Sequence, residues 1–110
     1  MLGVRLYLLQ RISAMFMAPL VLVHLGTMIY AIQGGLSAEE ILARTQGSIL
    51  WGLFYAIFVV AVSVHAAIGL RVIAFEWLRM RERLLDALTW IIGVLLLTGG
   101  MRAVYGVVLT

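Results

Sequence analysis

Two histidines lie inside long apolar stretches of this sequence, where packing explains them poorly. His65 falls within the apolar run 49–75 and His24 within the run 12–33. An ionisable ring in such surroundings needs a partner, and inside a membrane it marks a functional site by default. A neutral imidazole can ligate haem iron or carry protons. The position of His65 therefore indicates a membrane-embedded haem or quinone site.

Residues near His65 in the sequence suit a flat anionic ligand. Gly69 follows one turn later, and Arg71 follows six residues later. Along a helix His65 and Arg71 are about 9 Å apart, a suitable offset between an iron ligand and a cation for the propionates. The alternative is a structural histidine that bonds a neighbouring helix. These residues alone leave both interpretations open.

His24 allows several kinds of chemistry. Counting from Arg11, it lies about 20 Å into the first apolar stretch, farther than His65 from the arginine-rich face. It could ligate a second, more distal haem or carry protons. It could also simply hydrogen-bond to Thr27 or Tyr30.

Four further polar or aromatic residues are candidates for a quinone pocket. A quinone headgroup needs hydrogen-bond donors for two carbonyls and a proton source in apolar surroundings. Arg11 and Ser13 open the first apolar stretch and supply donors, while Glu76 and Trp77 follow the second on the same face. The alternatives are a snorkelling arginine, a serine bonded to its own helix, and an interfacial cap with an aromatic belt residue.

Composition places these residues in a membrane. The chain has 110 residues, of which 65% are hydrophobic, and its mean hydropathy is +1.13. Three stretches reach the roughly 20 residues that span a bilayer, at 12–33, 49–75 and 85–108. We therefore expect an all-α membrane protein, one anchor domain over 1–110. The lack of cysteine excludes thiolate metal sites and iron–sulfur ligation by this chain.

Arginine distribution predicts the topology. Arg5 and Arg11 precede the first span, and Arg79, Arg81 and Arg83 lie between the second and third, whereas the first connection holds only Arg44. The positive-inside rule then places the N-terminus in the cytoplasm and the C-terminus outside. With no evident cleavable signal, we expect a multi-pass protein of a bacterial cytoplasmic (inner) membrane. The net charge of +3 reflects topology, not nucleic-acid binding.

The connections and the small residues predict local structure. Gly34 and Gly35 should end the first span, and Ser37 with Glu40 fits a capping box for a short helix outside the membrane. Pro19 predicts a bend that is either merely tolerated or opens space near Arg11 and Ser13. Small residues along the spans allow close helix packing, either among these spans or in a larger bundle with another membrane subunit. We favour the larger bundle, since the histidines need partners.

Two segments resemble the hydrophobic anchor subunits of succinate dehydrogenase and fumarate reductase. The segment 10–14, which reads QRISA, resembles the HRxSG signature that opens their first span. The segment 65–71, HAAIGLR, followed by Glu76 and Trp77, is similar to their haem helix, where HxxxG precedes an acidic residue and often tyrosine. The resemblance covers nearly the whole chain, and its second motif is the more specific.

The resemblance implies a cytochrome b anchor without dicarboxylate chemistry of its own, beside flavoprotein and iron–sulfur subunits and a second anchor chain or another copy. His65 would be the axial ligand of haem b. Arg11 and Arg71 would contact propionates or quinone, and Ser13, Glu76 and Trp77 would border the quinone pocket. His24 is similar to first-helix ligands of two-haem members.

The sequence departs from the family pattern at Trp77, because an indole donates a hydrogen bond but has no hydroxyl proton to exchange. Two alternatives to the cytochrome remain at this stage. One is a haem-free structural anchor whose histidines are packing residues. The other is a small proton-coupled transporter that uses His24, Glu76 and Arg102.

Overall fold

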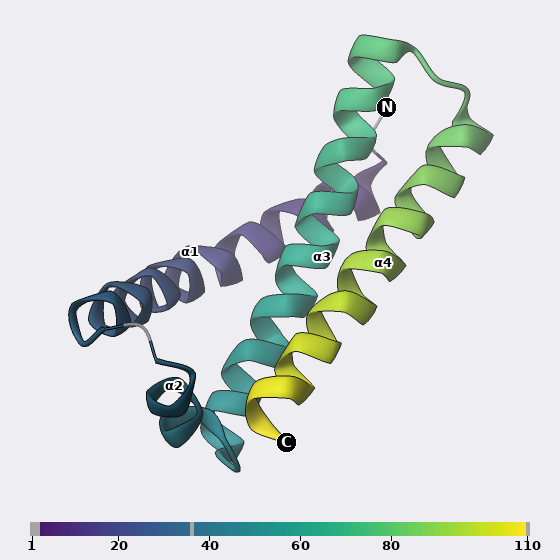
Figure 1. Ribbon diagram of the computed structural model, residues 1–110. Helices are drawn as coiled ribbons and strands as arrows, with labels where there is room; N and C mark the ends of the chain where they lie inside the picture. The colour runs from purple at the N-terminus through teal and green to yellow at the C-terminus, as the bar shows by residue number, and fades with distance from the viewer. Residues whose placement is uncertain (1–2, 36, 110) are drawn as a thin grey trace.

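The computed structural model describes residues 3–35 and 37–109 of the chain. Within them it contains four helices and no strand: α1 Val4–Gln33, α2 Ala38–Thr45, α3 Ile49–Leu78 and α4 Glu82–Val108 (Figure 1). The predicted all-α class is therefore confirmed.

Three of these helices, α1, α3 and α4, are long and apolar enough to cross a membrane, as the three predicted spans require. The helices extend beyond the spans, since α1 begins at Val4 and not at Ile12, and α3 continues to Leu78. A hydropathy span counts only the lipid-compatible residues, whereas a helix continues through polar residues until a cap ends it. Helix α1 also runs through Pro19, so this proline is tolerated.

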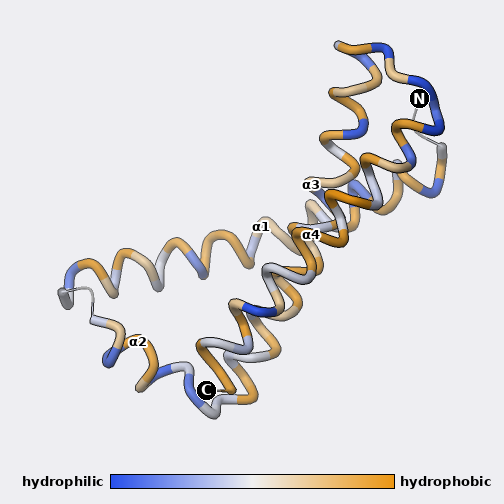
Figure 2. The backbone as a smooth tube through the Cα atoms, turned by 45° about the vertical axis from the view of Figure 1, so that its right-hand side comes forward, coloured by the Kyte–Doolittle hydropathy of each residue, from blue (hydrophilic) through white to orange (hydrophobic). Residues whose placement is uncertain are grey.

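Helix α3 is the centre of the bundle. It packs against α1 on one side and α4 on another, while α2 packs against α4. In both views the N-terminus and the α3–α4 turn lie at one end, and α2 and the C-terminus lie at the other (Figures 1 and 2). Helix α1 meets α3 near its own N-terminal half and diverges from the α3–α4 pair toward its C-terminal end. One side of α3 is therefore only partly covered within this chain.

The link from α1 to α3 follows the predicted pattern. Gly34 caps α1, and Gly35 adopts a φ of 80°, a left-handed conformation that glycine accepts without a Cβ penalty. The side chain of Ser37 then accepts a 3.3 Å hydrogen bond from the backbone N–H of Glu40 and starts α2. The predicted short helix is thus confirmed, with its serine N-cap.

Helix α2 is fastened to the end of α4. The buried hydroxyl of Thr45 donates to the carbonyl of Val107 at 2.7 Å, and the N–H of Gly47 donates to the carbonyl of Val108 at 2.7 Å. Both acceptors lie in the last turn of α4, where carbonyls have no partner within the helix. The two bonds therefore complete the C-terminus of α4 and fix where α2 lies.

The α3–α4 turn is short and polar. Arg79 caps α3 with a φ of 50°, the left-handed conformation that reverses the chain before α4 begins at Glu82. This turn is strongly hydrophilic while the helices it joins are mainly hydrophobic (Figure 2). Such a turn suits the water-facing end of a membrane hairpin.

Glycines bring α3 and α4 into close contact. A Cβ on Gly100 would lie 2.5 Å from Cγ1 of Val59, and one on Gly93 would lie 3.7 Å from Cβ of Ala67. Packing of small residues among the spans is confirmed here, as expected where no hydrophobic force drives helices together in lipid. A Cβ on Gly26 or Gly99 would meet nothing within 4 Å.

This difference between neighbouring glycines predicts a difference in stability. We expect Gly100→Ala to destabilise the α3–α4 pair by about 1–3 kcal/mol, because the new methyl group overpacks against Val59. Gly99→Ala is the matched control, and it should be neutral or stabilising because it adds helix propensity in open space. Thermal unfolding of the detergent-solubilised protein measures both. Equal effects of the two substitutions would contradict the packing described here.

Candidate functional site

The imidazole of His65 faces α1 at Ser13. Its Nδ1 lies 3.4 Å from Oγ of Ser13, and that hydroxyl donates to the backbone carbonyl of Gln10 at 2.9 Å. Because the serine proton is committed to Gln10, the serine oxygen is left to accept from an Nδ1–H. This arrangement favours the tautomer whose Nε2 has a free lone pair, which is the form that ligates a metal.

Gln10 adds an unsatisfied polar group beside this histidine. Its Oε1 is buried without a hydrogen-bond partner, and its Nε2 lies 3.6 Å from the position of a Cβ on Gly69. Ser13 itself is 6% exposed and lines an apolar cavity of about 390 Å³ between α1 and α3. The site thus combines an oriented imidazole, a buried amide oxygen of Gln10 that lacks a hydrogen-bond partner, and a helix surface without a side chain at Gly69.

His24 occupies a different environment. Its ring packs against Phe58 and Tyr55 of α3, with ring centroids 5.2 and 6.0 Å apart. The hydroxyl of Thr27 donates to the backbone carbonyl of His24 at 2.7 Å. Its Nδ1 is buried without a hydrogen-bond partner. This nitrogen therefore has capacity for a further group.

The two histidines belong to separate sites. His65 meets α1 at Ser13, and His24 lies eleven residues farther along α1, about 16 Å at a rise of 1.5 Å per residue. One iron therefore cannot take both rings as ligands. His24 also lies nearer the end that holds α2, since its partners on α3 are Tyr55 and Phe58, which agrees with the relative depths predicted from the spacing.

Arg71 is directed at α4 and not at the histidine site. Its side chain is 10% exposed and forms a 2.7 Å ion pair with Asp86, and it donates to the hydroxyl of Thr89 at 3.3 Å. Six residues along a helix turn a side chain about 120° away from the first, so His65 and Arg71 face different neighbours. To reach a group bound at His65, the guanidinium would have to turn from Asp86.

The sequence did not lead us to predict Asp86 and Thr89 as partners of Arg71. The available signal was an acid and a hydroxyl one turn apart at the entrance to the third span, the spacing that places two side chains on one helix face. The sequence did not show that these two side chains face Arg71.

The other predicted quinone residues lie apart from one another. The guanidinium of Arg11 lies 5.7 Å from the ring centroid of Tyr7 on its own helix. Glu76 lines a cavity of about 470 Å³ with Phe75 and Arg79 near the end of α3, and Trp77 is 80% exposed. The chain by itself does not gather these residues with Ser13 into one enclosed pocket within the described residues.

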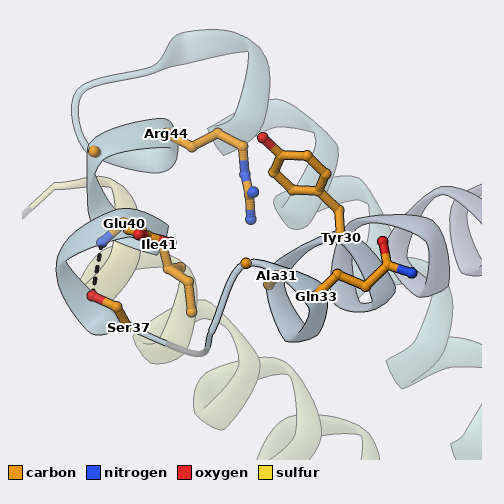
Figure 3. Close-up of a pocket in the computed structure, with 9 residues that line it drawn as sticks. Tyr30, Ala31, Gln33, Ser37, Glu40, Ile41 and Arg44 are labelled. Carbon is orange, nitrogen blue, oxygen red and sulfur yellow. Dashed lines mark hydrogen bonds between the residues drawn. The ribbon is translucent and has the colours of Figure 1, made fainter.

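A larger cavity of about 760 Å³ lies at the other end, between the end of α1 and α2. Arg44 of α2 and Tyr30 of α1 extend toward one another across it (Figure 3). The guanidinium of Arg44 also lies 5.3 Å from the ring centroid of Trp51. The residues that line this cavity include none of the predicted haem or quinone residues.

The described residues do not form a cluster of metal-ligating side chains. Across residues 3–35 and 37–109 there is no group of three or more His, Cys, Asp or Glu side chains that could hold an ion. A haem differs because the porphyrin supplies the other iron ligands and the protein supplies only axial ones. His65, with its oriented ring, fits that smaller requirement.

Comparison with known proteins agrees with this arrangement. A sequence match to the family described as "Succinate dehydrogenase/Fumarate reductase transmembrane subunit" covers residues 1–101. No curated protein and no solved structure matches the chain. The match includes α1, α2 and α3 entirely and most of α4, so we conclude that the chain belongs to the family of succinate dehydrogenase/fumarate reductase transmembrane subunits, the membrane part of a multi-subunit complex.

Proposed function

We propose that this membrane subunit is a cytochrome b anchor of a succinate:quinone oxidoreductase or a fumarate reductase, with His65 as the axial ligand of haem b. The observation that carries the proposal is the contact between His65 Nδ1 and Ser13 Oγ, at 3.4 Å. It holds the imidazole in the orientation and tautomer that leave Nε2 for iron. Haem, when bound, supplies a reversible one-electron centre within the membrane.

The second axial ligand must come from outside the His65 site. His24 is too far along α1 to share the iron, so we propose that a second anchor chain or another copy of this chain contributes the facing helix. The structure supports this, because α1 diverges from α3 and leaves part of the bundle uncovered (Figure 1). Open space at Gly26 and Gly99 would also let a neighbouring helix approach closely.

His24 is proposed as the ligand of a second, more distal haem. Its buried Nδ1 lacks a hydrogen-bond partner, and a nitrogen in that condition costs free energy unless a partner arrives. The rings of Tyr55 and Phe58 give it apolar walls suited to a porphyrin. In the alternative, His24 is a packing residue in an aromatic cluster.

For quinone chemistry we propose that Arg11, Ser13, Glu76 and Trp77 border the headgroup, with walls completed by partner subunits. Arg71 would contact the quinone, or would turn from Asp86 to contact a propionate. Ser13 lies beside His65. A quinone headgroup that contacts Ser13 would therefore lie next to the haem.

The flavoprotein and iron–sulfur subunits are proposed to dock at the end that holds the N-terminus and the α3–α4 turn. Arg79, Arg81 and Arg83 lie at that turn, so the positive-inside rule makes it cytoplasmic. Succinate would be oxidised, or fumarate reduced, in the flavoprotein, and electrons would pass through iron–sulfur centres to or from the membrane quinone. The host membrane would be a bacterial cytoplasmic membrane.

Substitution of His65 tests the haem assignment. We expect His65→Ala to remove the Soret absorption contributed by the haem at this site, because no other imidazole of this chain is within reach of that iron. The measurement is a visible spectrum of the purified complex, with succinate-to-dye activity as the control for intact soluble subunits. A spectrum unchanged by His65→Ala would favour the haem-free anchor instead.

Substitution of Ser13 tests how the ring is oriented. We expect Ser13→Ala to weaken haem retention about 10- to 100-fold, since loss of a hydrogen-bond partner of an axial ligand typically has that effect on metal affinity. Haem transfer to an apo-protein acceptor measures it. Thr98→Val is the control, because the hydroxyl of Thr98 bonds only carbonyls of its own helix and its loss should leave haem transfer unchanged.

The haem-to-flavin ratio of the intact complex decides the role of His24. About two haems per flavin, falling to about one in His24→Leu, is the expected result if each histidine serves its own iron. A ratio of about one that His24→Leu leaves unchanged would make His24 a packing residue. If no flavoprotein and no iron–sulfur protein copurified with this chain, that result would instead favour the proton-coupled transporter.

A further inference from the structure

The cavity of about 760 Å³ between the end of α1 and α2 has two side chains of opposite charge on its wall, Glu40 and Arg44. Both belong to α2, and they are four residues apart, a spacing that allows an ion pair on a helix. Within the described residues no ion pair joins them. Arg44 instead extends toward Tyr30 of α1 (Figure 3). The cavity therefore contains a cation and an anion that do not pair with each other.

Arg44 is held in this cavity without a carboxylate partner. Its Nε is buried and has no hydrogen-bond partner. Its guanidinium lies 5.3 Å from the ring centroid of Trp51, and a cation–π contact uses the face of the guanidinium and not the N–H groups at its edge. A buried donor without an acceptor costs free energy. A phosphate would remove this cost, because a guanidinium binds phosphate through parallel N–H···O bonds.

The cavity lies at the depth where lipid headgroups are expected. Tyr30 is near the end of one membrane-spanning helix and is 71% exposed, and Trp51 is near the start of the next. Tyrosine and tryptophan are enriched at the membrane–water interface. Ala31 and Ile41 add apolar surface to the cavity wall beside the charges. Such a mixed wall suits a headgroup joined to acyl chains better than it suits a fully hydrated ion.

The two charges restrict which headgroup fits. The Oε2 of Glu40 lies 3.6 Å from the position that a Cβ on Gly34 would take, so the carboxylate stands at the end of α1. A headgroup with only negative charge would meet Arg44 but would be repelled by Glu40, and one with only positive charge would meet the reverse. Ethanolamine phosphate carries both charges, because its phosphate accepts from a guanidinium and its ammonium donates to a carboxylate.

We propose that this cavity binds the phosphoethanolamine headgroup of a membrane phospholipid, with the phosphate at Arg44 and the ammonium at Glu40. The hydroxyl of Tyr30 donates to a second phosphate oxygen, and the acyl chains continue into the bilayer beside α1. With the topology proposed above, the lipid belongs to the outer leaflet. It would tie α2 to the end of α1, the part of α1 that diverges from the α3–α4 pair (Figure 1). The site does not depend on haem or quinone.

The phosphate contact is tested by titrating the intact complex, delipidated in detergent, with dioleoyl phosphatidylethanolamine and counting bound lipids by native mass spectrometry. We expect Arg44→Gln to weaken the tightest binding at least about tenfold, since it removes a charge-assisted hydrogen-bond donor. Arg102→Gln is the matched control. It removes the same charge from an exposed position of α4 that does not line the cavity, and it should leave the binding unchanged.

The ammonium contact is tested by a second pair of variants, which also serves if Arg44→Gln prevents assembly of the complex. Glu40→Gln removes the proposed acceptor, whereas Glu39→Gln is the control, because Glu39 does not line the cavity. Both residues lie in the first turn of α2, so both substitutions change the interaction with the helix dipole alike. We expect the unsubstituted complex to prefer dioleoyl phosphatidylethanolamine over dioleoyl phosphatidylcholine, whose nitrogen carries no hydrogen. Glu40→Gln should lose that preference and Glu39→Gln should keep it.

Two kinds of result would overturn the proposal. If the two arginine variants bind the lipid equally, or the two glutamate variants keep the same preference, the cavity does not hold this headgroup. If inorganic phosphate displaces the lipid, or dioleoyl phosphatidylglycerol binds more tightly, the site is one for free anions or for anionic lipids. None of these results changes the expected loss of haem in His65→Ala, so the haem assignment and the lipid site fail or stand separately.

Discussion

The central constraint on this protein is that α3 must satisfy ionisable side chains on two of its faces where little water is available. An unpaired polar group in hydrocarbon costs several kcal/mol in general, so each face needs a matching neighbour. Ser13 of α1 meets the imidazole of His65 on one face, and Asp86 of α4 meets the guanidinium of Arg71 on the other. The order of the bundle, with α3 between α1 and α4, follows from this need together with close packing.

The two faces are held with different strength. The α3–α4 face joins an ion pair to glycine contacts, and α2 is hydrogen-bonded to the end of α4, so this hairpin is a defined unit. The α1–α3 face is joined near the N-terminal half of α1 and then diverges (Figure 2). Of the three buried side-chain polar atoms without a hydrogen-bond partner among the described residues, Gln10 Oε1 and His24 Nδ1 lie on α1, and Arg44 Nε lies on α2. The less complete face is thus the one that carries the histidines.

His65 and Arg71 lie on different faces of α3 and contact different helices. His65 faces the side on which α1 leaves room for partners, while Arg71 faces a groove formed by this chain. If haem and quinone occupy these two faces, a single rigid helix sets the distance between them. Helices position groups more accurately than loops do, which favours placing both on α3.

Much of the architecture was available from the sequence. The three membrane helices, the glycine end of α1 at Gly34 and the serine cap of α2 at Ser37 were all predicted and are present. These features depend on local properties, because hydropathy over a span and the capping of a single turn involve residues close together in the chain. The family was predicted for the same reason, since short motifs around Ser13 and His65 carry it.

The partners of the key side chains were decided by tertiary structure. The spacing along the helix predicted that Arg71 would lie near a group bound at His65. It did not show that the guanidinium would turn to Asp86. Nor did it show that Ser13 would meet His65 across 52 positions of sequence, or that Gly100 and not Gly99 would touch α3. The sequence by itself determined which segments are helical and which residues are costly to bury. Only the packing of α1, α3 and α4 decided which faces meet, because the rotation of a helix about its axis depends on its neighbours and not on its own residues.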